Sequence, residues 1–550
     1  MEQQNRQEIS QFTLGMPDFI TIVTEEKKQI IALSGDCIQT EDIRVEIKEE
    51  TKQTDIYTEI LLTADKSPVK SLKLRWNRKA PQKARILCDA WERGYGDLEW
   101  RGICGGRTMP WYFLVSVKDH QWGYGVKVRP SAMCFWQMDT QGITLVLDVR
   151  CGGRGVLLNG RTLTAAQIVA LEMEGEDSFQ AARELCGLMC TDPIFPEHPV
   201  YGSNNWYYAY GESSEKEILS DTDYVLELTK GAENKPYMVI DDGWQELRTP
   251  EYIGGPWKKG NAKFPDMERL AGRMKEKGVH PGIWLRFLLN ADEEIHKDWR
   301  LPHNGCLDPS HPDALNYVKE DVKRICDWGY ELIKHDFSTY DLFGRWGFEM
   351  NPMVTEDGWH FYDRTKTSAE VVKMLYEAIY EASREKNVLI LGCNTIGHLG
   401  AGLMHMNRTG DDTSGLNWER TRRMGINTLA FRLPQHRTFY DVDADCVGIA
   451  GNIPWELNRQ WADVIAESGT PLFVSAKPGV LNDQEKEELR RIMCKASGQK
   501  QHKIPADWQD TDCPEVWKDE NETLHYQWYA PAGSIPESKD EKFHAFIPLS

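Results

Sequence analysis

Three short segments of the sequence place charged side chains at or near the end of a strand-like run. The triplet 334–336 (Lys-His-Asp) follows Leu-Ile, the Asp pair 241–242 follows Tyr-Met-Val-Ile, and a second Asp pair stands at 411–412. In a solvated loop such residues would do no chemistry, but at the ends of buried strands they would converge on one point. Carboxylates that face each other in this way can serve as a nucleophile and as a general acid or base.

Other polar and aromatic residues occupy matching positions at the ends of neighbouring strand-like segments. They are Asn204, Asn205, Trp206, Trp284, Arg286, Cys393, Asn394, Arg408, Asp441, Asp443 and Asp445. Sugar hydrolysis needs such a set, because two carboxylates flank the glycosidic bond while other polar groups hold the hydroxyls. No His/Cys cluster with zinc spacing accompanies them, so we expect no metal and no cofactor.

The elements that would position these residues are expected between about residues 199 and 500. Strand-like and helix-like segments alternate there, and the strand-like ones are 200–210, 236–244, 280–290, 330–338, 388–394, 403–412, 439–449 and 470–478. Helical spacing appears between them, for example at Val371, Leu375 and Ile379. Eight such units predict a (β/α)8 TIM barrel, whose active site lies at the carboxyl ends of the strands. A doubly wound open sheet is the alternative, but no Gly-rich turn follows the first strand.

Two further parts flank this region. Residues 1–190 contain short alternating runs such as "DIYTEILLTA" and "ITLVLDVRC", which predict an N-terminal antiparallel β-sandwich. The Pro-rich piece "TDPIFPEHPV" then leads into the barrel, which we assign to 191–500. Residues 501–550 become strand-like again in "ETLHYQWYA" and "KFHAFIPL" and predict a short C-terminal β segment. The predicted fold is therefore a multidomain α/β protein.

Composition excludes several classes of partner. The formal charge of -20 over 550 residues argues against a nucleic-acid backbone or an anionic membrane surface. No window approaches the apolar length of a membrane span, and the N-terminus does not resemble a secretory signal. The 13 Cys are scattered and odd in number, which favours reduced thiols and a cytoplasmic location. The run 441–445 is not a calcium loop, because its sixth and twelfth positions are Cys446 and Asn452.

Each candidate also has a structural interpretation. The Asp pair 241–242 could end a strand and cap a helix, and one Asp of 411–412 could be a helix N-cap. Lys334 and Asp336 could form an ion pair that only stabilises the fold. Cys393 is better explained as a core residue than as a nucleophile, since no basic pattern surrounds it. The functional interpretation depends on the agreement of all these residues on one rim.

Several motifs, in this order along the chain, resemble those of the melibiase-type α-galactosidases, glycoside hydrolase families 27 and 36 of clan D. "YMVIDDGWQ" resembles their second-strand motif, and "PWKKGNAKFPDMERLAGRMKEKGVHPGIW" resembles the segment that follows it. "IKHDFS" resembles their K-x-D nucleophile strand, "NRTGDD" their acid/base strand and "ESGTPLFVS" their eighth strand. The resemblance covers roughly residues 199–500, and the N-terminal part is similar to the β-sandwich that precedes the barrel in family 36.

The resemblance implies catalytic roles for two aspartates. Asp336 matches the nucleophile. Asp411 matches the acid/base through its T-G-D context, whereas the spacing from Arg408 would favour Asp412. We assign the acid/base role to Asp411. Together with the strand-end residues, the expected substrate contacts are Asp241, Asp242, Trp206, Lys334, Arg408, Cys393, Asn394, Trp284 and Asp412.

We therefore expect a retaining glycoside hydrolase that removes terminal α-galactosyl residues by double displacement, with a carbohydrate as its partner. The segments "GCNTIGHLG" and "FSTYDLFGRWGFEM" depart from the usual family 36 pattern, so the substrate stays open. The alternatives are an α-N-acetylgalactosaminidase, another α-glycosidase or α-galactosyltransferase of the clan, and a catalytically inactive carbohydrate-binding barrel. The resemblance also allows a homo-oligomer, because related enzymes often form dimers, trimers or tetramers.

Overall fold

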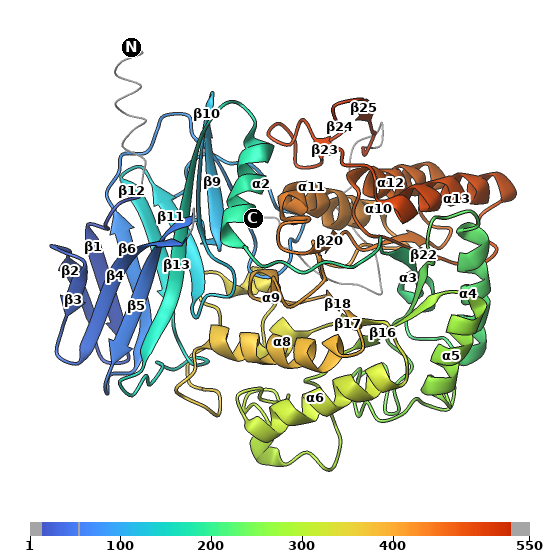
Figure 1. Cartoon of the computed structure of the whole chain (residues 1–550), viewed down its shortest axis with the longest axis horizontal. Helices are drawn as coiled ribbons and strands as arrows, with labels where there is room; N and C mark the ends of the chain where they lie inside the picture. Colours follow the sequence, from blue (N-terminus) through green and yellow to red (C-terminus); the bar gives the residue numbers. More distant parts are fainter. Residues whose placement is uncertain (1–13, 53–54, 530–550) are drawn as a thin grey trace.

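A computed structural model of the chain describes residues 14–52 and 55–529. Figure 1 shows two antiparallel sheets at one end, a curled parallel sheet surrounded by helices at the other, and a small fourth sheet, β23 to β25 (within residues 504–525), beside α10 to α12 (within residues 418–468). The predicted order of parts, from antiparallel to parallel and back to a short β segment, is confirmed for the described residues.

The N-terminal part consists of two antiparallel sheets. The first has the order β2-β1-β6-β12-β11-β8, with strands Phe19–Thr24 (β1), Lys28–Ala32 (β2), Val69–Trp76 (β6), Met109–Pro110 (β8), Met133–Asp139 (β11) and Gly142–Asp148 (β12). The second has the order β3-β4-β5-β13-β10-β9-β7, with strands Cys37–Gln39 (β3), Ile43–Lys52 (β4), Asp55–Ala64 (β5), Arg85–Cys88 (β7), Tyr112–Val117 (β9), His120–Val126 (β10) and Thr162–Glu174 (β13).

Aromatic side chains join the inner faces of these two sheets. The ring of Trp136 on β11 lies 5.6 Å from that of Phe113 on β9 and 6.3 Å from that of Tyr124 on β10. Along β6, buried side chains recur mostly at every second residue, as expected for strands with one face in a core. Helix α2 (Ser178–Met189) packs on β10 and β13 and precedes the linker into the parallel sheet.

The parallel sheet has nine strands in the order β20-β19-β18-β17-β16-β15-β14-β22-β21. They are Tyr201–Asn204 (β14), Tyr237–Ile240 (β15), His280–Leu285 (β16), Leu332–His335 (β17), Leu389–Gly392 (β18), Met406–Arg408 (β19), Asp441–Asp443 (β20), Cys446–Ile449 (β21) and Leu472–Ala476 (β22). Each of the eight predicted strand segments contains at least one of these strands. The arrangement is consistent with a TIM-like barrel, as predicted.

The ninth strand arises because the predicted seventh strand is interrupted. Only Ala444 and Asp445 separate β20 from β21, and Asp445 has a positive φ of 71°, which breaks the extended backbone. As a result β20 pairs with β19 while β21 pairs with β22, so the two edges of the sheet are consecutive pieces of one segment. The sheet therefore curls until its edge strands lie next to each other in the chain.

Helices cover the outside of the parallel sheet, and α4, α5, α6 and α8 lie in a row in Figure 1. The longer helices are Glu215–Leu228 (α4), Met267–Lys277 (α5), Pro312–Asp327 (α6), Ser368–Arg384 (α8), Trp455–Ser468 (α12) and Asp483–Gly498 (α13). The short ones are Trp206–Ala209 (α3), Ser338–Phe343 (α7), Gly397–Gly400 (α9), Trp418–Thr421 (α10), Thr428–Arg432 (α11), Lys297–Trp299 (η1), Gly347–Met350 (η2), the π-helix Arg422–Asn427 (η3) and Leu433–Gln435 (η4). In α8 the residues Val371, Leu375 and Ile379 are buried, as their spacing predicts.

The C-terminal sheet contains Ile504–Pro505 (β23), Val516–Lys518 (β24) and Thr523–His525 (β25). Lys503, directly before β23, ties this sheet to α12, because its Nζ lies 2.8 Å from Oε2 of Glu467. The ring of Trp508 packs 5.4 Å from Phe179 of α2, so this piece contacts both larger parts. The strand predicted in "ETLHYQWYA" is present as β25, while "KFHAFIPL" lies outside the described residues.

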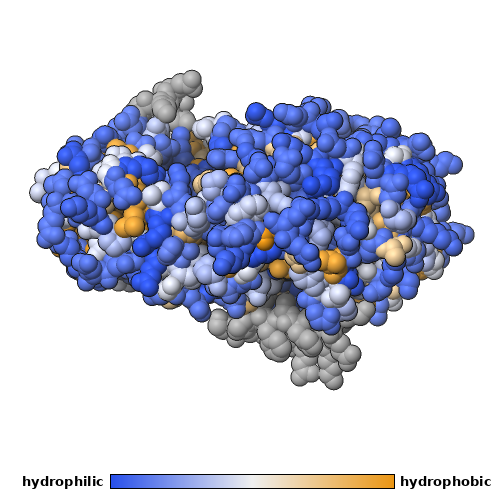
Figure 2. Space-filling model, turned by 90° about the horizontal axis from the view of Figure 1, so that it is seen from below, coloured by the Kyte–Doolittle hydropathy of each residue, from blue (hydrophilic) through white to orange (hydrophobic). Residues whose placement is uncertain are grey.

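The surface seen in Figure 2 is mostly hydrophilic, and hydrophobic residues appear on it in small separate patches. Within residues 14–52 and 55–529, no helix combines the length and the apolar character that a bilayer crossing requires. All 13 cysteines are free thiols, in agreement with the expectation of reduced cysteines.

Candidate active site

Strand β17 directs its last polar residues to two different sides. Lys334 Nζ donates to Asp241 Oδ2 at 2.8 Å, and Asp336 Oδ2 accepts from Trp284 Nε1 at 2.9 Å, both on the inner side of the sheet. The ring of His335 instead packs 5.9 Å from Tyr376 of α8, and burial lowers the pKa of His335 to about 3. The alternation of strand side chains thus separates Lys334 and Asp336 from a neutral, structural His335.

Asp336 is a buried carboxyl whose two oxygens are both hydrogen-bonded. Its Oδ1 accepts from the backbone N of Phe337 at 2.7 Å, in addition to the Trp284 contact at Oδ2. Burial raises the pKa of Asp336, and the positive charges of Lys334 and Arg93 oppose that rise. Two hydrogen bonds therefore fix the direction of this carboxyl, and two cations support its ionised form.

The predicted sugar-binding pair, Asp241 and Asp242, lies beside Lys334. Asp241 Oδ2 also accepts from Asn204 Nδ2 at 2.7 Å, so the direct ion-pair partner of Lys334 is Asp241. Asp242 Oδ1 accepts from Gln245 Nε2 at 2.6 Å, and burial raises the pKa of Asp242. The pair is therefore part of a polar network, and Lys334 supports Asp336 through its charge without a direct contact.

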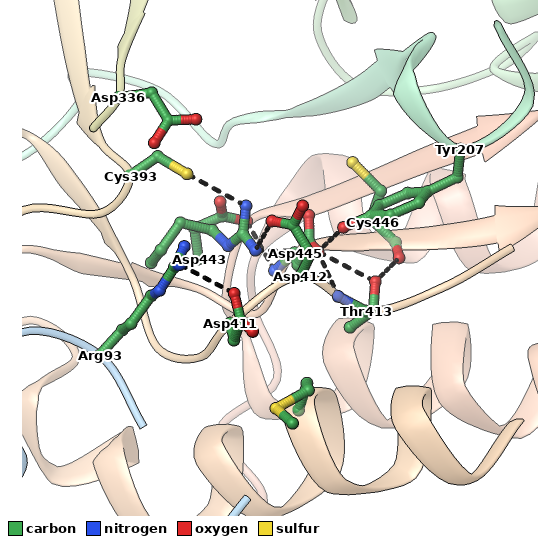
Figure 3. Close-up of polar contacts among 12 residues, drawn as sticks. Arg93, Tyr207, Asp336, Cys393, Asp411, Asp412, Thr413, Asp443, Asp445 and Cys446 are labelled. Atoms are coloured by element: carbon green, nitrogen blue, oxygen red, sulfur yellow. Dashed lines mark hydrogen bonds and ion pairs between the residues drawn. The ribbon is translucent and has the colours of Figure 1, made fainter. Parts of the chain in front are cut away.

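Asp411 is held by two arginines from different parts of the chain. Its Oδ1 lies 2.8 Å from Arg93 Nη2, and its Oδ2 lies 3.0 Å from Arg420 Nη2. Figure 3 shows Arg93 reaching Asp411 from the side opposite to Asp412 and Asp445. The side chain of Asp411 is only 8% exposed. Both of its oxygens are thus occupied by buried guanidinium groups.

Asp412 has a different environment, because its side chain is 26% exposed and faces Arg408 at 3.1 Å. Arg408 Nη2 also lies 2.9 Å from Asp445 Oδ2, and its Nη1 donates to Cys393 Sγ at 3.3 Å. Burial favours the protonated form of Asp412, but the charges of Arg408, Arg93 and other cations outweigh it and lower the pKa. Asp412 is also the aspartate whose charge raises the pKa of Asp336. Asp412 therefore interacts electrostatically with the candidate nucleophile.

The remaining predicted contacts lie on the same rim. Cys393 and Asn394 follow β18, and burial raises the pKa of the Cys393 thiol, so it is not an activated nucleophile. The side-chain amide of Asn394 is buried and has no hydrogen-bond partner among the described residues. Trp206 begins α3 and is half-buried, with its ring 5.5 Å from that of Tyr210. Trp284 is buried and donates its Nε1 hydrogen to Asp336. It therefore positions this carboxyl and does not present its ring face to a ligand.

Two arginines of this site were missed by the sequence analysis. Arg420 lies on α10, and Arg93 lies in the segment 89–100 of the N-terminal part, far from the barrel in sequence. Neither arginine directly follows an apolar strand. The residues around Arg93, Trp-Glu-Arg-Gly at 91–94, also show no strand or helix periodicity that would place Arg93 at a site. Asp445 was named as a strand-end residue, and the structure gives it a partner in Arg408.

This arrangement can support acid/base and nucleophilic chemistry on a neutral ligand. It combines two electrostatically linked carboxyls with hydrogen-bonding groups at the ends of β14 to β19 and in the connection between β20 and β21. No cluster of three or more potential metal-binding side chains occurs within the described part of the chain.

Comparisons with known proteins agree with this architecture. No protein-family model matches the chain. Solved structures do: an α-galactosidase from Thermus thermophilus in complex with p-nitrophenyl α-D-galactopyranoside has a TM-score of 0.58 at 16% identity, over 90% of this chain and 99% of that one. A GH36 α-galactosidase from Geobacillus stearothermophilus in complex with raffinose has a TM-score of 0.57 at 14% identity, over 89% and 77%.

A third neighbour is an uncharacterized protein from Listeria monocytogenes in complex with α-D-glucose, β-D-glucose, magnesium and calcium. Its TM-score is 0.55 at 12% identity, over 94% of this chain and 55% of that one. At these identities the similarity concerns the fold. The chain therefore has a fold like that of the GH36 α-galactosidases, as its motifs predict.

Proposed function

We propose that this protein is a retaining glycoside hydrolase that acts on α-galactosides, with Asp336 as nucleophile. The observation that carries the proposal is the environment of Asp336 at the end of β17. Its carboxyl is fixed by Trp284 and Phe337, lies under the charge of Lys334, and is electrostatically coupled to a second carboxyl, Asp412. The shared fold of α-galactosidases supports the choice of substrate class.

We assign the acid/base role to Asp412 in preference to Asp411. A general acid must exchange a proton with a leaving group, and Asp411 has both oxygens tied to buried arginines. Asp412 has one cationic partner, Arg408, and is the more exposed of the two. The spacing of four residues from Arg408 to the acid/base agrees with this choice, while the T-G-D context that favoured Asp411 is explained by a structural carboxylate.

The proposed reaction proceeds in two steps. Asp336 attacks the anomeric carbon while Asp412 gives its proton to the departing oxygen, and a β-glycosyl-enzyme forms. Asp412 then takes a proton from water, which attacks the same carbon and releases the α-sugar. Asp241, Asp242 and Lys334 would hold hydroxyls of the sugar, and Trp206 would pack against its ring.

The protonation of the pair sets the active fraction of the free enzyme. The reaction needs Asp336 ionised and Asp412 protonated, but in the substrate-free site burial raises the pKa of Asp336 and Arg408 lowers that of Asp412. The negative charge of Asp412 adds to the rise in the pKa of Asp336, so the ionisation of Asp336 sets the acid limb of the pH profile.

The test is the stereochemistry of hydrolysis on a panel of p-nitrophenyl α-glycosides. We expect turnover of the α-galactoside, with α-galactose as the first product seen by ¹H NMR before mutarotation. First appearance of β-galactose would contradict the retaining mechanism. Preference for an α-N-acetylgalactosaminide or an α-glucoside would keep the mechanism but change the sugar that is released. Transfer of the sugar to an added acceptor would indicate a transferase. Sugar binding without turnover of any member of the panel would indicate an inactive barrel.

A further inference from the structure

A segment of the N-terminal part, residues 89–100 ("DAWERGYGDLEW"), lies against the rim of the parallel sheet. The backbone N of Gly94 donates to Thr409 O at 2.8 Å, and Asp411 N donates to Gly94 O at 3.0 Å. A Cβ at Gly94 would lie 2.8 Å from Thr428 Cγ2, so the close approach depends on glycine. The segment therefore pairs directly with the chain that carries Asp411 and Asp412.

Arg93 extends from this segment into the active site. Its side chain is 6% exposed, and its Nη2 lies 2.8 Å from Asp411 Oδ1. The guanidinium carbon lies 5.4 Å from the centroid of the Trp346 ring, which belongs to the segment after the candidate nucleophile. Arg93 Nε has no hydrogen-bond partner among the described residues, and its nearest carboxylate oxygen is that of Glu92 at 3.7 Å.

We propose that Arg93 is a positioning residue of the active site, supplied by the N-terminal part, which fixes the direction of the Asp411 carboxyl and holds a positive charge beside Asp336 and Asp412. This inference rests on the proposed function and extends it, because it makes the N-terminal sheets a contributor to the catalytic centre. Trp346 and the pairing of Gly94 with the rim hold the guanidinium in place.

Electrostatics supports this placement. Arg93 is one of the two cations that lower the pKa of Asp336, and it also lowers the pKa of Asp412. The charged and titratable groups that act on Asp336 are Lys334, Arg93, Arg286, Asp341, Asp412 and Cys393. Lys334 and Arg93 are the two cations that act on both Asp336 and Asp412, and of these two Arg93 is supplied by the N-terminal part.

The test replaces Arg93 and follows the pH dependence of kcat/KM on an aryl α-galactoside. In Arg93→Met, both limbs of the profile should move to higher pH by about one unit, because one cation within reach of both carboxyls is lost. On the acid side of the profile, well below the lower limb, this corresponds to a fall of about tenfold at fixed pH. Arg93→Lys keeps the charge and should keep the position of the profile.

Two further variants separate this effect from loss of folding. Arg101→Met removes the same charge eight residues further along the chain, where the side chain is 46% exposed. It should leave both limbs of the pH profile unchanged. Because Arg93 compensates the buried carboxyl of Glu92, the double variant Glu92→Gln/Arg93→Gln removes both charges and keeps the shift measurable if Arg93→Met does not fold.

A ¹³C NMR titration of the aspartate carboxyls reads the same shift at Asp336 without turnover. The inference is overturned if the folded Arg93 variants keep the wild-type profile and the wild-type Asp336 titration, or if Arg101→Met shifts the profile as far. A wild-type protein that hydrolyses no glycoside, but whose Asp336 titration moves in Arg93→Met, would contradict the proposed function and still support the placement of Arg93.

Discussion

Replacing each of the two neighbouring aspartates with asparagine should produce opposite phenotypes. In Asp412→Asn the general acid is lost, so kcat for an alkyl leaving group, as in melibiose, should fall by about 10²- to 10⁴-fold. A nitrophenyl leaving group departs without protonation and should be affected much less in the first step. Stability should change by only about 1 kcal/mol, because the Asn carbonyl still accepts from Arg408 and Asp445 still neutralises it.

Asp411→Asn should instead be a stability variant. It removes the carboxylate that neutralises Arg93 and Arg420, whose side chains are 6% and 7% exposed. Breaking a buried ion pair by removing one partner costs about 3–5 kcal/mol, because a charge stays buried without compensation. Any fall in kcat should be the same for melibiose and for the nitrophenyl galactoside.

The assays are steady-state kinetics on both substrates and chemical unfolding of both variants, with azide added as an external nucleophile. Azide should accelerate Asp412→Asn on the nitrophenyl galactoside and yield the α-galactosyl azide, since it attacks the β-glycosyl-enzyme. Leaving-group dependence and the azide product in Asp411→Asn, together with mainly lost stability in Asp412→Asn, would contradict both assignments.

Three further predictions follow from individual contacts. Trp284→Phe removes the hydrogen bond to Asp336 Oδ2 and should lower kcat/KM by about tenfold to 100-fold, measured on an aryl galactoside, with the thermal midpoint as a control. Lys503→Met leaves Glu467 without one buried partner and should lower the free energy of unfolding by about 3 kcal/mol at unchanged kcat; equal stability in urea would contradict this. The acid limb of kcat/KM should lie above the usual aspartate pKa of about 3.9, because Asp336 must be ionised and burial raises its pKa; a limb at or below that value would argue against Asp336.

Much of the fold could be predicted from local sequence patterns. The alternation of strand-like and helix-like segments indicated the eight regions that hold the strands of the parallel sheet, and the spacing of Val371, Leu375 and Ile379 indicated α8. The break between β20 and β21 could not be predicted. It depends on the positive φ of Asp445, and the alternating Asp residues of 441–445 fit a continuous strand equally well.

The site was predictable where strand geometry decides it and ambiguous where distant parts of the chain decide it. Alternation along β17 was enough to place Lys334 and Asp336 together and His335 apart. The choice between Asp411 and Asp412 depends on Arg93, which arrives from a segment more than 300 residues earlier in the chain. Local sequence context alone favoured Asp411 as the acid/base. The ion pairs of Asp411 with Arg93 and Arg420 are visible only in the structure.

The product that Asp336→Ala forms in the presence of azide shows directly whether Asp336 is the nucleophile. If Asp336 is the nucleophile, the variant should be inactive on p-nitrophenyl α-galactoside, and azide should restore release of nitrophenol by attacking from the vacated β face. The account predicts β-galactosyl azide as the product, identified by ¹H NMR. Wild-type activity without azide, or rescue that yields the α-galactosyl azide, would contradict it.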